Sequence, residues 1–270
     1  MKTLDNRPIG VFDSGLGGLT VVKELMEQMP NESIVYFGDT GRVPYGTRSR
    51  ETIIKYAVQD INFLMTFDIK AIIIACGTAS SVALDYVTEK FDIPIIGVVN
   101  PTAKAAVLAT KNKKIGILGT TGTINSGSYQ KYIAGIDENI EVIAKPCPLF
   151  VPLVENGYTD NKVAHLVAEE YLEPLINAGV DTIILGCTHY PLLSGVISDI
   201  MGKEITLIDS GVPTSAYVHN MLSSRDIMAT AEASYKYFVS DSIDSFAHLG
   251  SMFLNRQISS EVSRISIENY

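Results

Sequence analysis

Two cysteines follow similar apolar runs in the two halves of the chain. Cys76 ends the run at residues 71–76, Cys187 ends the run at residues 182–187, and small or hydroxyl-bearing residues follow each of them. Inverting a stereocentre needs a base on one face of the substrate and an acid on the other, and the two exchange roles in the reverse direction. A thiol with a pKa near 8.5 becomes a thiolate at neutral pH at a cost of about 2 kcal/mol. Two thiols on either side of one substrate could therefore invert an α-carbon.

Other interpretations of the cysteines have to be weighed. A free cysteine is often a small buried apolar residue, and we expect that of Cys147, which lies between two prolines. The sequence has three cysteines, no C-x-x-C pair and no His/Cys cluster at zinc-ligand spacing, so neither a disulfide framework nor a zinc site is expected. A reversible bridge between Cys76 and Cys187 is an alternative, although both lack a nearby resolving cysteine.

A glycine-rich loop, Asp13-Ser14-Gly15-Leu16-Gly17-Gly18, follows the first apolar run. Its spacing does not fit G-x-G-x-x-G and it lacks a Walker lysine, which argues against a nucleotide site. Backbone N–H groups at the start of a helix can bind a carboxylate as readily as a phosphate. Asp13 would repel an anion, so it suits the orientation of an ammonium group or a thiol. The alternative is that Asp13 caps a helix that begins at Leu16.

The elements that position these residues follow from the hydrophobic pattern. Continuous apolar runs alternate with amphipathic stretches, which predicts an α/β fold with doubly wound, mainly parallel sheets covered on both faces. The predicted strands are residues 9–12, 34–37, 71–75, 95–99, 115–118, 182–185 and 205–208. The predicted helices are residues 19–29, 51–65, 79–90 and 163–176.

Each cysteine is thus expected just after a strand and just before a helix, at residue 79 onward or at Pro191 onward. A helix N-terminus favours a thiolate by about 1 kcal/mol. Pro191 suits the first turn of a helix, and His189 could favour the Cys187 thiolate further. For His189, a purely structural role is the alternative.

A weak internal repeat relates the two halves of the sequence. The matching segments are 9–15 with 115–121, 71–78 with 182–189, and 93–97 with 205–209. We infer two similar α/β lobes related by a pseudo-two-fold axis.

The expected lobes are residues 1–98 plus 208–270, which carry Cys76, and residues 99–207, which carry Cys187. Ligands of such sheets bind beyond the carboxyl ends of the strands. We therefore expect the active site in a cleft between the lobes, with a thiol on either side.

Composition limits the partners. With 30 acidic and 21 basic residues the net charge is −9, so a nucleic acid or an anionic membrane surface would be repelled. The first eight residues contain no apolar signal segment, and the apolar runs are too short to span a bilayer. We expect a cytoplasmic protein with a small-molecule substrate.

Four segments together resemble the glutamate racemases of the aspartate/glutamate racemase superfamily. They are residues 11–20, residues 38–46 with Pro44-Tyr45-Gly46, residues 75–79, and residues 185–193 with Gly186-Cys187-Thr188-His189-Tyr190-Pro191. The match runs from about Pro8 to Ser210 and extends more weakly through residues 235–255.

The resemblance implies racemisation of glutamate by two thiols, without pyridoxal phosphate, metal or other cofactor. Cys76 would act on D-glutamate and Cys187 on L-glutamate, assisted by Asp13, Glu155 and His189. The residues expected to line the substrate site are Asp13, Ser14, Tyr45, Gly46, Gly77, Thr78, Thr121, Thr188 and His189. The family also implies a homodimer and a supply of D-glutamate for peptidoglycan. For Glu155, a plain surface position is the alternative.

One position departs from the family pattern, because Gly77 stands where asparagine is usual after the first cysteine. We expect altered affinity rather than lost activity, since the backbone N–H at this position is kept. The alternatives left open are a racemase of aspartate, hydantoin or another related acid, and an amino-acid-binding protein without catalysis.

Overall fold

The computed structural model describes residues 5–270. Residues 1–4, the first half of the segment in which no apolar signal was found, lie outside the described residues. The chain divides into two compact units. Unit 1 comprises the chain up to Val98 together with Gly211–Tyr270, and unit 2 comprises Val99–Ser210. Within the described residues, no helix is long and apolar enough to cross a membrane.

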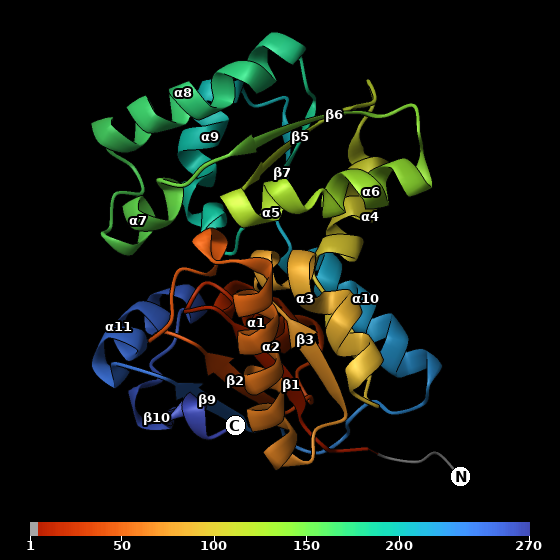
Figure 1. The fold of residues 1–270 in the computed structure, drawn as a ribbon, viewed down its shortest axis with the longest axis vertical. Helices are drawn as coiled ribbons and strands as arrows, with labels where there is room; N and C mark the ends of the chain where they lie inside the picture. Colours follow the sequence, from red (N-terminus) through yellow and green to blue (C-terminus); the bar gives the residue numbers. More distant parts are fainter. Residues whose placement is uncertain (1–4) are drawn as a thin grey trace. The chain divides into compact units, whose positions relative to one another are not determined.

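Unit 1 is built on a six-stranded sheet in the order β10-β9-β2-β1-β3-β4, and each strand runs parallel to its neighbours. The strands are β1 (Ile9–Asp13), β2 (Ile34–Gly38), β3 (Ala71–Ile74), β4 (Ile95–Gly97), β9 (Tyr235–Val239) and β10 (Val262–Arg264). The helices are α1 (Leu19–Gln28), α2 (Arg50–Leu64), α3 (Gly77–Lys90), α10 (Gly211–Ser224) and α11 (Ile243–Leu254). Both ends of the chain meet in this sheet, where red and orange strands lie beside blue ones (Figure 1).

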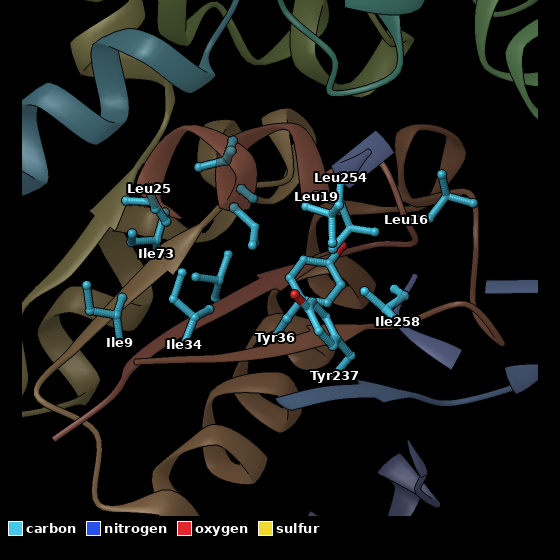
Figure 2. Packing of buried hydrophobic residues seen from close by; sticks show 14 of the residues in the cluster. Ile9, Leu16, Leu19, Leu25, Ile34, Tyr36, Ile73, Tyr237, Leu254 and Ile258 are labelled. Carbon is cyan, nitrogen blue, oxygen red and sulfur yellow. The ribbon is translucent and has the colours of Figure 1, made fainter. Parts of the chain in front are cut away.

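Alternate residues of the unit 1 strands point to two separate cores. Tyr36 and Ile73 pack with α1, α10 and α11 on one face, whereas Phe37 and Ile74 pack with α2 and α3 on the other. Figure 2 shows part of the first core, in which side chains from the strands and from α1 interdigitate, among them Ile9, Ile34, Tyr36, Ile73, Leu19 and Leu25. The runs are apolar without interruption because both faces of the sheet are buried.

Unit 2 is built on a four-stranded parallel sheet in the order β6-β5-β7-β8. The strands are β5 (Lys114–Gly119), β6 (Glu141–Pro146), β7 (Thr182–Leu185) and β8 (Thr206–Ile208). The helices are α4 (Val99–Ala109), α5 (Thr121–Ser126), α6 (Ser128–Ile136), α7 (Phe150–Glu155), α8 (Lys162–Ala178) and α9 (Ser194–Met201). One core packs against α7, α8 and α9, and the other against α4 and α6.

The predicted repeat is confirmed in the topology of the two units. The order β2-β1-β3-β4 in unit 1 corresponds to β6-β5-β7-β8 in unit 2. The register agrees as well, because Ile9 pairs with Ala71 and Ile115 pairs with Thr182. Cys76 and Cys187 therefore follow equivalent strands, β3 and β7, each next to the first strand of its unit.

The predicted start of helix α1 at Leu19 is confirmed, whereas two other local predictions were wrong. Strand β4 ends at Gly97 rather than Val99, and Val99 already belongs to α4. The segment at Pro191 forms a single 3₁₀ turn, Tyr190–Leu193, before α9 begins at Ser194.

Candidate active site

Cys76 is placed at the carboxyl end of β3 and caps the N-terminus of α3. Its sulfur accepts a hydrogen bond of 3.4 Å from the backbone N–H of Ala79, and the residue is 4% exposed. The N-terminal end of the helix dipole favours negative charge on this sulfur. The expected position of Cys76 at a helix N-terminus is confirmed.

The end of β1, which pairs with β3, brings two predicted residues to Cys76. The Cys76 thiol donates to the Ser14 hydroxyl, with 3.5 Å between Sγ and Oγ. Asp13 is fully buried, and its Oδ2 accepts the backbone N–H of Gly15 at 3.0 Å. The capping alternative for Asp13 is wrong, because the N-cap of α1 is Gly18 and has no side-chain capping bond.

Tyr45 and Gly46 form a buried 3₁₀ turn, Tyr45–Thr47, after β2. The Tyr45 hydroxyl donates to Asp39 and lies 3.0 Å from Oδ2 of Asp60. The side chain of Tyr45 is thus engaged in the interior, where two carboxylates hold its hydroxyl.

Arg42 completes this buried cluster. Its guanidinium donates to Asp39 at 2.6 Å and to Asp60 at 2.9 Å. Burial raises the pKa of Asp60 well above its ordinary value, the charge of Asp39 raises it further, and Arg42 offsets only part of this. Sequence reasoning missed Asp60 as a partner of Tyr45, whereas Asp39 and Arg42 entered it only as members of the segment 38–46.

Cys187 follows β7 and is partly buried. A histidine lies beside its sulfur, and a carboxylate contacts the far side of the histidine ring. Nδ1 of His189 lies 3.9 Å from the Cys187 sulfur, and Nε2 lies 3.2 Å from Oε1 of Glu155 at the end of α7. His189 is 4% exposed, whereas the Glu155 side chain is 35% exposed. The arrangement lets Glu155 orient the imidazole ring of His189 beside the Cys187 sulfur.

The other predicted site residues lie near the ends of the same strands. Gly77 and Thr78 are the first two residues of α3, and both are buried. Thr121 begins α5, just beyond β5, and Thr188 is buried next to Cys187. The structure thus brings Asp13, Ser14, Gly77 and Thr78 together with Cys76, and His189, Glu155 and Thr188 together with Cys187.

Cys147 lies in the interior of unit 2, as expected of a structural cysteine. It is fully buried in an apolar core, and burial raises the pKa of its thiol well above the ordinary value. Its backbone carbonyl accepts the Tyr190 hydroxyl at 2.9 Å. A thiol held neutral in this way is a poor base. Across residues 5–270, no group of three or more His, Cys, Asp or Glu side chains is arranged to hold a metal ion.

Comparison with known proteins agrees with this geometry. Residues 9–214 match the model of the Asp/Glu/Hydantoin racemase family. A relative in sequence is the glutamate racemase of Geobacter metallireducens, 45% identical over 264 residues that cover 97% of either chain. A similar solved structure is the glutamate racemase isoform RacE1 of Bacillus anthracis, with a TM-score of 0.93, 38% identity and 98% of both chains covered.

A second solved structure is the glutamate racemase of Francisella tularensis in complex with D-glutamate. It superimposes with a TM-score of 0.92 at 41% identity and covers 99% of this chain and 100% of its own. The length and identity of these matches, together with cysteines at the ends of equivalent strands, establish that the chain belongs to the Asp/Glu/Hydantoin racemase family.

Proposed function

We propose that this protein is a cofactor-independent glutamate racemase in which Cys76 and Cys187 are the two acid–base groups. The observation that carries the proposal is the equivalence of the thiols. They follow β3 and β7, which hold the same place in two sheets of the same strand order. Inversion at a carbon needs two such groups, one for each face.

In the direction from L- to D-glutamate, the Cys187 thiolate takes the α-proton, and the electron pair of the broken C–H bond stays on the substrate as a carbanion. The Cys76 thiol then gives its proton to the opposite face and becomes the thiolate. The reverse direction exchanges the two roles. His189 and Glu155 stabilise the anionic form of Cys187, whereas Ser14 and the backbone N–H of Ala79 do so for Cys76.

Glutamate is the proposed substrate because the relatives that match along nearly their whole length are glutamate racemases, one of them solved with D-glutamate. Asp13 is proposed to orient the ammonium group of the substrate. Hydroxyl and backbone donors of Ser14, Gly46, Gly77, Thr78, Thr121 and Thr188 are proposed to bind the two carboxylates. The protein is proposed to be a homodimer.

The proposed biological role is the supply of D-glutamate for peptidoglycan. The reaction is placed in the cytoplasm, where thiols stay reduced.

The proposed mechanism is tested by racemisation in deuterated water. When L-glutamate is consumed, Cys76 delivers a hydron that has exchanged with solvent, so newly formed D-glutamate should contain deuterium at the α-carbon. The remaining L-glutamate should gain little label early in the reaction. Transfer of the substrate's own proton into the product at the first turnover would contradict the assignment of two bases.

Alanine variants of the cysteines provide the second test. Cys76→Ala and Cys187→Ala should each lower racemisation in both directions by at least about 10²-fold, since both groups act on one path. Cys147→Ala is the matched control and should keep its activity, because this thiol lies in the apolar core. A panel of amino acids that includes aspartate tests the substrate. Binding of glutamate without any racemisation would instead support a binding protein.

A further inference from the structure

The loop that follows β1 accepts a hydrogen bond from a buried tyrosine, Tyr36, that the proposed mechanism does not use. Tyr36, in the middle of β2, is fully buried and donates its hydroxyl to the carbonyl oxygen of Gly15 at 2.9 Å. Burial raises the pKa of Tyr36 well above its ordinary value, and the charges of Asp13 and Cys76 raise it further. The phenol therefore stays protonated and remains a donor.

Both backbone polar groups of Gly15 are held by hydrogen bonds. Its N–H donates to Asp13 Oδ2 at 3.0 Å, and its carbonyl accepts from Tyr36. Gly38 leaves room for this carbonyl, because a Cβ at position 38 would lie only 2.3 Å from the Gly15 oxygen. Gly18 leaves room for the phenol, since a Cβ there would lie 3.0 Å from the Tyr36 hydroxyl and 2.6 Å from Cβ of Asp13.

Ser14 lies between Asp13, which is held in β1, and Gly15, which is held by its two hydrogen bonds. The Ser14 hydroxyl contacts Cys76. Asp13 belongs to β1 and is paired with Gly38 in the sheet, so its backbone does not depend on Tyr36. Ser14 is the first residue beyond the strand, and its position depends on how Gly15 is held. The 3.5 Å contact between Ser14 Oγ and Cys76 Sγ is thus linked through Gly15 to the phenol.

We propose that Tyr36 is a positioning residue for the reaction, which holds the Gly15 carbonyl so that Ser14 stays in hydrogen-bonding contact with the Cys76 thiol. The proposal rests on the proposed racemase function and adds a residue that touches neither the substrate nor the thiol. It also predicts that Tyr36 affects the Cys76 face of the reaction and leaves the Cys187 face unchanged.

Tyr237 provides a matched control in the same core. Its ring lies 6.3 Å from that of Tyr36, on the neighbouring strand β9, and Figure 2 shows the two tyrosines beside each other. Among the residues that the structure describes, the buried Tyr237 hydroxyl has no hydrogen-bond partner. Tyr36→Phe and Tyr237→Phe therefore remove the same atom from the same cluster, but only the first removes a bond to the loop.

The first measurement needs no substrate. Amide hydrogen exchange of the peptide that contains residues 14–18, followed by mass spectrometry, should be faster in Tyr36→Phe by about 2- to 10-fold, the ratio expected for one neutral hydrogen bond. Tyr237→Phe should match the wild type. Equal exchange in the two variants would overturn the proposal, whether or not the protein racemises glutamate.

The second measurement uses α-deuterated substrates. In Tyr36→Phe, kcat should fall by about 2- to 10-fold with little change in KM. The isotope effect on kcat/KM should rise for D-glutamate, whose deuteron Cys76 removes, and fall for L-glutamate, whose deuteron Cys187 removes. A general loss of stability would change the isotope effects for both substrates alike, and such a symmetric change would overturn the proposal.

A double-mutant cycle with Ser14 completes the test. Ser14→Ala removes the hydroxyl through which Tyr36 acts, so it should show the same asymmetry of isotope effects, and Tyr36→Phe should then add little to it. Additive effects of the two changes would contradict the proposed path. Circular dichroism checks that the variants are folded; should Tyr36→Phe not fold, the absence of the asymmetry in Ser14→Ala alone would overturn the proposal. A wild-type protein that racemises no glutamate would refute the proposed function, whereas the exchange experiment would still decide the role of Tyr36.

Discussion

The two thiols have different partners although they follow equivalent strands. Cys76 is supported by a backbone N–H and by the hydroxyl of Ser14, and both act at short range in a buried site. Cys187 is supported by His189, which is itself in contact with Glu155. Single substitutions should therefore affect one face of the reaction at a time.

We expect Glu155→Gln to slow the proton transfer by Cys187. The carboxylate is partly exposed and screened by solvent, so the loss should be at most about 1 kcal/mol, roughly a factor of five in kcat/KM. The isotope effect should rise for α-deuterated L-glutamate and fall for D-glutamate. Glu169→Gln, an exposed change on α8, is the control. An unchanged isotope pattern in Glu155→Gln would leave Glu155 as a surface residue.

Gly77→Asn tests the departure from the family pattern at the first residue of α3. An added amide would contact substrate in the ground state and the transition state alike, so KM should change more than kcat. Gly135→Asn in α6 is the control, since the space around its Cβ position is open. A collapse of kcat at constant KM in a folded Gly77→Asn variant would contradict this role.

At the scale of elements, a buried polar cluster joins the segment after β2 to helix α2. Asp39, Arg42 and Tyr45 come from the segment, and Asp60 comes from α2. The serine of a distant segment, Ser240, adds a hydrogen bond to Asp39 at 2.8 Å. The cluster fixes the turn at Tyr45 and Gly46, whose backbone is proposed to contact the substrate.

Asp60→Asn should change the dependence of stability on pH. The folded pKa of Asp60 is raised above the ordinary value of 3.8, so its contribution is greatest below pH 3.8 and is lost as the pH rises toward the folded pKa. The free energy of unfolding of Asp60→Asn relative to wild type should therefore increase with pH, by up to about 1.4 kcal/mol per pH unit. Denaturant unfolding between pH 4 and 8 measures this. A difference between Asp60→Asn and wild type that stays flat across this pH range would refute the assignment.

Most strands could be predicted from the sequence, including the partly buried edge strand β8, whereas β6, β9 and β10 could not. β1, β3 and β7 are apolar throughout because both of their faces are covered. β6 is an edge strand that contains Glu141 and Pro146 and is only partly buried, so its pattern is mixed. β9 joins the sheet of unit 1 by pairing with β2, and β10 pairs with β9 in turn. The pairing of β9 with β2 is a long-range contact that no local pattern indicates.

The candidate site divides in the same way. Cys76 and Cys187 were found from the repeat, and Asp13, Ser14 and His189 lie within a few residues of an apolar run. Asp60 was missed because it lies in the middle of a helix whose pattern indicates only an amphipathic surface. Tyr36 was missed because a tyrosine within a buried strand is indistinguishable in sequence from an ordinary core residue.

At the scale of the whole molecule, unit 1 is made from two separate parts of the chain. A buried ion pair in the N-terminal part binds the backbone of the C-terminal part. Nζ of Lys70 lies 2.7 Å from Oε2 of Glu32, and both side chains are almost fully buried. Lys70 also donates to the carbonyl of Ile227 at 2.9 Å, and Glu32 accepts the backbone N–H of Ala229 at 2.7 Å. Both charged groups thus bind the C-terminal part of the unit.

Lys70→Met should destabilise the protein by about 3–5 kcal/mol, because it leaves the Glu32 carboxylate buried without its cation. The double variant Glu32→Leu with Lys70→Met should recover part of this loss. Lys23→Met removes an exposed i,i+4 pair with Glu27 at 3.9 Å and should cost at most about 0.5 kcal/mol. Denaturant unfolding measures all three. A loss below 1 kcal/mol in Lys70→Met would show that the pair does not hold the two segments.

The interrupted course of unit 1 has a consequence for biosynthesis. Val99–Ser210 form unit 2 without a contribution from later residues, so the sheet that carries Cys187 can be completed while the ribosome is still translating. The sheet that carries Cys76 cannot, because β2 lacks its neighbour β9 until residues 235–239 have emerged. During that interval β2 is an unprotected edge, open to pairing with another nascent chain. The growing polypeptide thus exposes this strand edge until residues 235–239 pair with it and remove the hazard.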